Sequence, residues 1–163
     1  MELTFYTCAL VALAAALRCV THTNPVHSLL YLVVLLLAVA GIFFAIGAPF
    51  AGALEVIIYA GAIMVLFVFV VMMLNLGAET AAQEHAWLRP RTWIGPGILA
   101  MVMLASLVSG ILHAPGLVGT VTVDAKQVGI ALFGPYLLAV ELASLMLLGA
   151  LVAAYHLGRE ETR

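Results

Sequence analysis

Two carboxylates, Glu55 and Glu141, lie inside long runs of apolar residues in this sequence. An ionisable side chain at membrane depth is costly, and such groups commonly belong to a proton or ion path. Tyr59 follows Glu55 by four residues, so on a helix the carboxylate and the phenol lie on one face. These residue types indicate proton transfer as the chemistry to consider first.

Each of these side chains also has a purely structural interpretation. Glu55 lies near the end of its apolar run, where a carboxylate caps the start of a helix at the membrane interface. Tyr59 is equally typical of a buried tyrosine with a satisfied hydroxyl. Glu141 can be a protonated or partnered carboxylate, held by Ser144 or by another subunit. Residue spacing leaves both interpretations open.

The segment that follows Tyr59 has an unusual order of side-chain sizes. Gly61 lies between two alanines, and residues 63–71 are mostly β-branched or aromatic. Glycine in a membrane helix most often permits close packing. It also weakens the helix locally, and a thin point beside polar groups suits a π-bulge or a rotation. This segment therefore predicts a helix that changes shape.

The composition determines where such a helix lies. Of the 163 residues, 66% are hydrophobic and 9% are charged, with a mean hydropathy of +1.22. No soluble domain of this size buries so much apolar surface. We expect an all-α integral membrane protein with a single membrane domain, residues 1–163. The five predicted membrane-spanning helices are residues 3–20, 28–46, 52–76, 93–112 and 132–156.

The cations indicate the orientation of these helices. With five spans, the first and third loops and the C-terminus share one side of the membrane, and that side holds Arg18, Arg89, Arg91, Arg159 and Arg163. The other side has only Lys126. The positive-inside rule then predicts a periplasmic N-terminus and a cytoplasmic C-terminus. Residues 120–123 are β-prone and predict a small hairpin in the loop between the fourth and fifth spans.

No residue pattern indicates a cofactor on this chain. Most of the five histidines lie at the ends of the spans, and no pair has the i, i+4 spacing of a helical metal site. A glycine-rich phosphate loop, a serine-hydrolase elbow and a basic stripe for nucleic acid are also absent from the sequence. We therefore expect no catalytic residue, metal or cofactor here, and a role as one subunit of a larger membrane complex.

Four segments carry a resemblance to a known family. The most specific is FAGALEVIIYAGAIMVLFVFVVMMLNLG, residues 50–77, and the others are residues 21–32, 93–99 and 132–161. Together they resemble the subunit J family of bacterial NADH–quinone oxidoreductase, respiratory complex I, whose mitochondrial counterpart is NADH dehydrogenase chain 6. The likeness runs from end to end of the chain.

The resemblance implies a five-span subunit in the membrane arm of complex I, in the bacterial inner membrane. In that complex FMN, iron–sulfur clusters, NADH and quinone are bound by other subunits, and the energy of quinone reduction drives proton translocation. The resemblance also implies the lipid bilayer and subunits A, H, K and N as neighbours, and no nucleic acid.

The family's third span has a π-bulge near the positions that match Tyr59, Gly61 and Val65. By this resemblance, the helix rotates between bulged and regular forms and opens or closes a water path. A change of this kind would move Met64, Val65 and Phe67 into or out of the path. The candidate residues for the proton path and its gate are Glu55, Tyr59, Gly61, Met64, Val65, Phe67 and Glu141.

Two other functions fit the same residues. The chain could be a subunit of a multisubunit cation/proton antiporter, in which the acids serve antiport without quinone. It could also be a structural scaffold, in which Glu55 and Glu141 only satisfy neighbouring groups. Co-purification with peripheral iron–sulfur subunits would distinguish a complex I subunit from an antiporter subunit. Neutral glutamine replacements with unchanged pumping would favour the scaffold.

Overall fold

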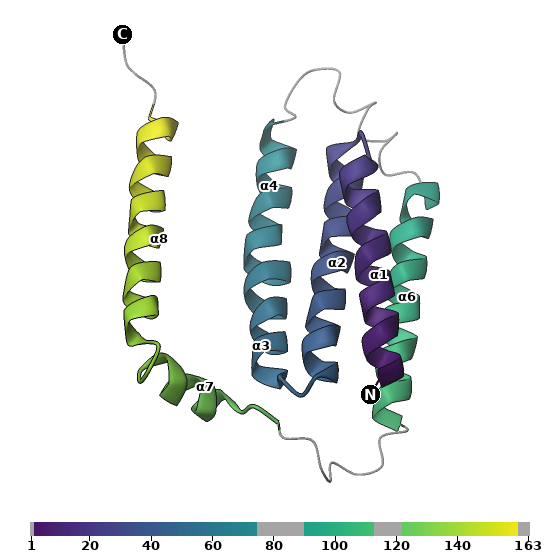
Figure 1. Ribbon diagram of the computed structural model, residues 1–163. Coiled ribbons are helices and arrows are strands. Elements are labelled where there is room, and N and C mark those ends of the chain that lie inside the picture. Colours follow the sequence, from purple (N-terminus) through teal and green to yellow (C-terminus); the bar gives the residue numbers. More distant parts are fainter. Residues whose placement is uncertain (1, 75–89, 113–121, 160–163) are drawn as a thin grey trace. The chain divides into compact units, whose positions relative to one another are not determined.

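The computed structural model describes residues 2–74, 90–112 and 122–159. The chain divides into two compact units, Met1–Thr122 and Val123–Arg163. In the first unit the helices are α1 (Glu2–Thr21), α2 (Pro25–Ala45), α3 (Pro49–Leu54), η1 (Glu55–Ile63), α4 (Met64–Leu74) and α6 (Pro90–Leu112) (Figure 1). The second unit holds α7 (Ala125–Leu132) and α8 (Leu137–Gly158).

The predicted all-helical membrane fold is confirmed. In the described part of the chain, five helices are long and apolar enough to cross a membrane: Glu2–Thr21, Pro25–Ala45, Pro49–Val71, Trp93–Leu112 and Leu137–Gly158. The third of these is one continuous helix made of α3, η1 and α4. It begins at Pro49 rather than at the predicted Gly52, because proline at the first helical position needs no hydrogen-bonded N–H.

Short turns with strong local signals separate the first three spans. Asn24 caps α2, since its side-chain oxygen accepts hydrogen bonds from the backbone N–H groups of Val26 and His27 at 3.0 and 3.4 Å. At the other end of α2, Gly47 has a φ of 82°. The N–H of Ala48 then donates to the Phe43 carbonyl at 2.9 Å, which completes a Schellman motif.

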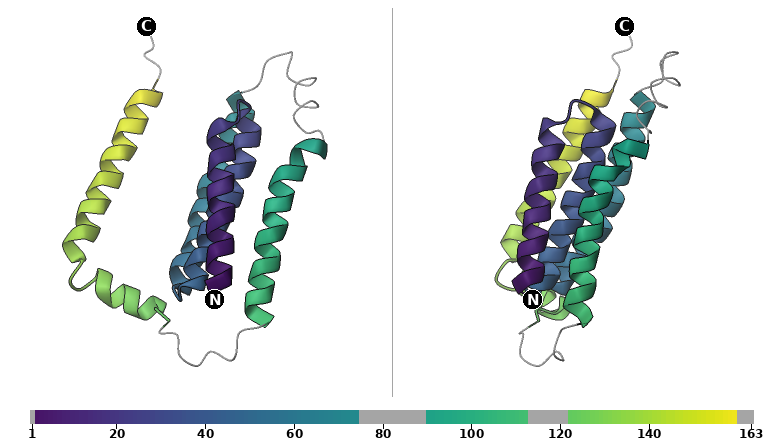
Figure 2. Two further views of the ribbon diagram at one scale, coloured as in Figure 1. Left: turned by 45° about the vertical axis from the view of Figure 1, so that its right-hand side comes forward. Right: turned by 90° about the vertical axis from the view of Figure 1, so that its right-hand side faces the viewer.

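The buried core of the first unit lies between α1, α2 and α6, which run side by side in both views of Figure 2. Small side chains dominate it: Cys8, Ala15 and Ala38 are fully buried. A Cβ added at Gly41 of α2 would lie 2.8 Å from the Cys8 sulfur, so only glycine allows this approach. The hydroxyls of Thr7 and Ser106 hydrogen-bond across α1 and α6. Close packing of small residues is how membrane helices associate without a hydrophobic driving force.

The fifth span, in the second unit, begins later in the sequence than predicted. The turn at Gly134 and Pro135 interrupts the apolar run, so the spanning helix α8 begins at Leu137 rather than at Leu132. A Cβ at Gly134 would lie 2.7 Å from the Ile130 carbonyl oxygen, which explains the glycine in this turn. The predicted hairpin at residues 120–123 falls largely outside the described residues, and Thr122 and Val123 have no regular secondary structure.

Candidate functional site

The first turns of the third span are held against α2. A Cβ at Gly52 would lie 3.1 Å from the Ala40 carbonyl oxygen and 3.1 Å from the ring of Phe44. Gly52 is buried, so α3 approaches α2 more closely here than a side chain would allow. This contact of Gly52 was not predictable, because one small residue in an apolar run does not show which helix it faces.

The middle of the third span is a π-helix. It runs from Glu55 to Ile63, whereas the sequence placed a π-bulge near Tyr59–Val65. Met64, Val65 and Phe67 therefore lie in the regular α-helix that follows. Both flanking residues, Leu54 and Met64, have ordinary right-handed helical angles, so the π segment is inserted into an otherwise regular helix. Such insertions are rare and occur frequently at functional sites.

Gly61 lies within this π segment. A Cβ added there would lie 3.1 Å from the carbonyl oxygen of Val56, five residues earlier. That contact is tighter than ordinary van der Waals contact, and the atom concerned belongs to the backbone, which cannot move aside like a side chain. The absence of a Cβ at Gly61 therefore favours the π form of this turn.

Glu55 and Tyr59 both belong to the π segment, as their spacing predicted. Glu55 is half-buried and Tyr59 is 51% exposed. Within the described residues, their side chains make no hydrogen bond to each other. No residue of the π segment is fully buried. The acid and the phenol are thus open to whatever lies beside this chain, whether lipid, water or another subunit.

The α-helix beyond the π segment has two unlike sides. Met64 is only 3% exposed, and α4 contacts α2. Val65 and Phe67 are 66% and 53% exposed. Six of the seven candidate residues therefore share one continuous helix, but the three beyond the π segment do not share one surface.

The seventh candidate, Glu141, belongs to the other compact unit, on α8. It is exposed, like nearly every residue of that helix. The Ser144 hydroxyl donates to the backbone carbonyl of Glu141 at 2.8 Å, so this bond satisfies the backbone rather than the carboxylate. In the described residues no group of three or more His, Cys, Asp or Glu side chains could hold a metal ion.

Comparison with known proteins gives the family. Residues 15–157 match the family model of NADH-ubiquinone/plastoquinone oxidoreductase chain 6. This chain belongs to that family.

Relatives within the chain 6 family cover almost the whole sequence. NADH-quinone oxidoreductase subunit J of Escherichia coli K12 is 62% identical, over 99% of this chain and 88% of the relative. The subunit of the same name from Pseudomonas aeruginosa is 60% identical, over 100% of this chain and 99% of the relative. That of Buchnera aphidicola from Schizaphis graminum is 51% identical, over 99% of each. The resemblance drawn from the four sequence segments is thereby confirmed.

Proposed function

We propose that this chain couples quinone reduction to proton translocation through a change of shape in its third span. As a member of the chain 6 family, the chain is a subunit of NADH–quinone oxidoreductase. In this proposal other subunits bind NADH, FMN, the iron–sulfur clusters and quinone. This chain, in the bacterial inner membrane, moves no electrons itself and contributes a gate.

The observation that carries the proposal is the π-helix at Glu55–Ile63. A π-bulge is one extra residue accommodated in a helix, and its hydrogen bonds are less favourable than those of an α-helix. Since an α-helix advances about 100° per residue, removing one bulge rotates everything beyond it by about that angle. A change of one residue in hydrogen-bond register thus becomes a large rotation of α4.

The contacts of the span indicate which end would turn. α3 is held against α2 at Gly52, where backbone and ring atoms leave no room. Beyond the π segment, Met64 is the buried residue of α4 among those whose side chains are described. In the regular form Ile63 would take the direction that Met64 now has. The rotation would therefore carry Met64, Val65 and Phe67 to new directions.

The polar side chains give this rotation a function. Glu55 and Tyr59 are the first and the middle residues of the π segment, where a water path could reach a carboxylate and a phenol. Rotation of the bulky Val65 and Phe67 would open or close that path toward acids of the neighbouring subunits A, H and K. Glu141, on α8, is a further proton-path candidate.

The test uses Gly61→Val and Val65→Gly in the assembled complex. Two quantities are measured on the same membranes: electron transfer from NADH to quinone and the proton gradient it sustains, each normalised to assembled complex. We expect full assembly with at least severalfold weaker pumping, since valine at position 61 would press on the Val56 carbonyl and disturb the π turn. Matched controls are Gly97→Val, where nothing lies within 4 Å of an added Cβ, and Val68→Gly, on α4 beyond the candidate gate residues.

Two results would contradict the gate. Loss of assembled complex in proportion to activity would make the span a packing element. Normal pumping at full assembly would make it a passive wall. Glu55→Gln and Glu141→Gln with unchanged pumping would in addition favour the scaffold role for the two acids.

A further inference from the structure

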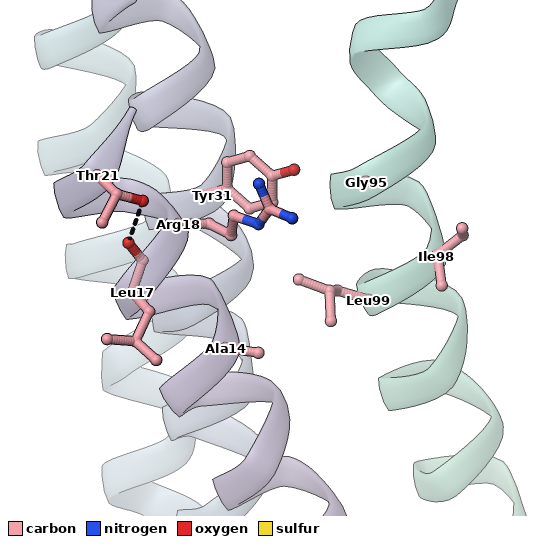
Figure 3. A pocket seen from close by; sticks show the side chains of 8 residues that line it. All are labelled: Ala14, Leu17, Arg18, Thr21, Tyr31, Gly95, Ile98 and Leu99. Atoms are coloured by element: carbon pink, nitrogen blue, oxygen red, sulfur yellow. Dashed lines mark hydrogen bonds between the residues drawn. The ribbon is translucent and has the colours of Figure 1, made fainter. Parts of the chain in front are cut away.

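A groove opens between α1 and α6, with one residue of α2 at its base (Figure 3). Its volume is about 500 Å³, within the range of about 300–1,000 Å³ typical of small-molecule sites. Arg18 and Tyr31 line one end, and both side chains project into the space between the two helices in Figure 3. The rest of the lining consists of Ala14, Leu17, Thr21, Gly95, Ile98 and Leu99.

Tyr31 is a polar side chain more than nine-tenths buried, at 9% exposure. Its hydroxyl is directed at Gly95 of α6, and a Cβ added there would collide with the hydroxyl oxygen. Glycine at this position therefore leaves space for the phenol. Within the described residues the hydroxyl has no hydrogen-bond partner. No side-chain nitrogen or oxygen there is both fully enclosed and unpartnered, so this oxygen is still reached from the groove.

Arg18 is the second donor without a partner at this end of the groove. It lies in the last turn of α1 and is exposed, and its side chain makes no ion pair or hydrogen bond to any residue that the structure describes. A guanidinium is always charged and presents five N–H donors, which match the oxygens of a phosphate. A cation and a phenol that both lack acceptors favour an anion with several oxygens.

The remainder of the groove is apolar and extends away from the helix ends. Leu17 and Ala14 precede Arg18 on α1, while Ile98 and Leu99 follow Gly95 on α6. Because both helices cross the membrane, both apolar sets lie deeper than the two donors. The site is thus polar at the membrane surface and apolar below, and basic pockets of this kind between membrane helices bind lipid head groups.

We propose that this groove binds one anionic phospholipid. Its phosphate accepts hydrogen bonds from the Arg18 guanidinium and the Tyr31 hydroxyl, and the first part of one acyl chain lies against Leu17 and Ile98. The absence of a side chain at Gly95 keeps the phenol accessible to the lipid. This inference does not depend on any change of shape in the third span.

The experiment uses the whole complex, reconstituted into phosphatidylcholine vesicles. A small fraction of the lipid carries a photoreactive diazirine near the start of one acyl chain, on either phosphatidylglycerol or phosphatidylcholine. After illumination, the adducts on the peptides of α1 and α6 are quantified by mass spectrometry. We expect far more adduct at the groove with phosphatidylglycerol than with phosphatidylcholine.

Substitutions identify the groups that hold the lipid. Arg18→Gln should lower the phosphatidylglycerol adduct about tenfold, because a charge-assisted hydrogen bond is lost, and Tyr31→Phe about threefold. Tyr31→Phe keeps the ring, so it tests the site even if Arg18→Gln impairs assembly. Ile98→Trp should fill the groove and abolish both adducts. Lys126→Gln, which removes an exposed cation of the other unit, should leave the phosphatidylglycerol adduct at the groove unchanged.

Three results would overturn the proposal. Equal labelling by the two lipids would show a surface without preference for the anion. Unchanged labelling in both Arg18→Gln and Tyr31→Phe would show that the phosphate is held elsewhere. Labelling that falls on a neighbouring subunit and never on α1 or α6 would show that protein fills the groove.

Discussion

The α1–α2–α6 core and the third span are both apolar, but they pack in opposite ways. In the core, Cys8, Ala15 and Ala38 are fully buried, and at Gly41 the Cys8 side chain leaves no room for a side chain on α2. In the third span, the whole π segment has no fully buried residue. Close contact along its length holds a helix in one hydrogen-bond register, because any rotation would drive its atoms into the closely packed neighbouring helix.

The third span combines close packing at its beginning with a π segment that buries no residue. Gly52 packs the beginning of the span closely against α2. The π segment also contacts α2 but buries no residue, and Met64 is the buried residue of α4 among those whose side chains are described. A helix that is anchored at one end and loosely held at the other can change register in between. The π-helix thus lies in a segment without buried residues, and four predictions test this contrast with the core.

The largest effect is expected at Gly41. In Gly41→Val the first carbon of the side chain would lie 2.8 Å from the Cys8 sulfur, and the two methyl groups would need still more room. Overpacking of this kind costs about 1–3 kcal/mol, and we expect the upper end here. The measurement is the fraction of this chain recovered in the solubilised complex. Adding Cys8→Ala should restore part of the assembly, and a double variant as poor as Gly41→Val would contradict the contact.

The second-largest loss of stability is expected for Met64→Ala. The deleted side chain is 3% exposed and would leave a cavity against α2, for which we expect about 2 kcal/mol, the low end for such truncations. The readout is the temperature at which the solubilised complex releases this chain. Val65→Ala is the matched control, since Val65 is 66% exposed within the chain. A larger loss for Val65→Ala would mean that a neighbouring subunit, rather than α2, holds this part of the span.

A smaller effect is expected at the start of α2. Asn24→Ala removes the acceptor for the N–H groups of Val26 and His27 and should cost about 1 kcal/mol. Asn24→Asp keeps a capping oxygen and should retain stability. The same release temperature reports both variants. The N-cap residue of α3 is Ala48, which makes no side-chain cap hydrogen bond, so an equivalent loss is not expected there. Equal destabilisation by the two replacements of Asn24 would rule out capping as the cause.

The smallest effect concerns the hydroxyl pair between α1 and α6. Thr7→Val, Ser106→Ala and the double variant form a cycle whose coupling energy should be about 0.6 kcal/mol, as for other hydrogen bonds between membrane helices. The stability of each variant is again measured as the temperature at which the solubilised complex releases this chain. A coupling energy of zero would show that close packing, and not this hydrogen bond, holds the two helices together.

Much of the fold was predictable because its signals are local. Asn24, Pro25 and Gly47 mark turns that the structure contains, and apolar length alone identified five spans. The start of the fifth span was misplaced, since Phe133 and Tyr136 extend the apolar run across a turn at Gly134. Hydropathy does not detect a change of chain direction within an apolar segment.

The candidate site was predictable in part. The position of Gly61 next to Tyr59 indicated a weak point, and a π-helix is present there, although it begins at Glu55. The burial of Met64 and the exposure of Val65 could not be read from the sequence. Both are apolar residues in an apolar run, and the π-helix itself shifts the face that each one occupies.

Composition and turn residues were enough to predict five helices long and apolar enough to cross a membrane, because a bilayer imposes length and hydropathy on each helix independently. Which glycines serve close packing was decided only by the tertiary structure. Gly41 and Gly52 bring α2 against its neighbours, Gly61 admits a π turn, and Gly95 makes room for a phenol. These glycines are chemically identical, so what distinguishes them is the atom that each would meet if it carried a side chain.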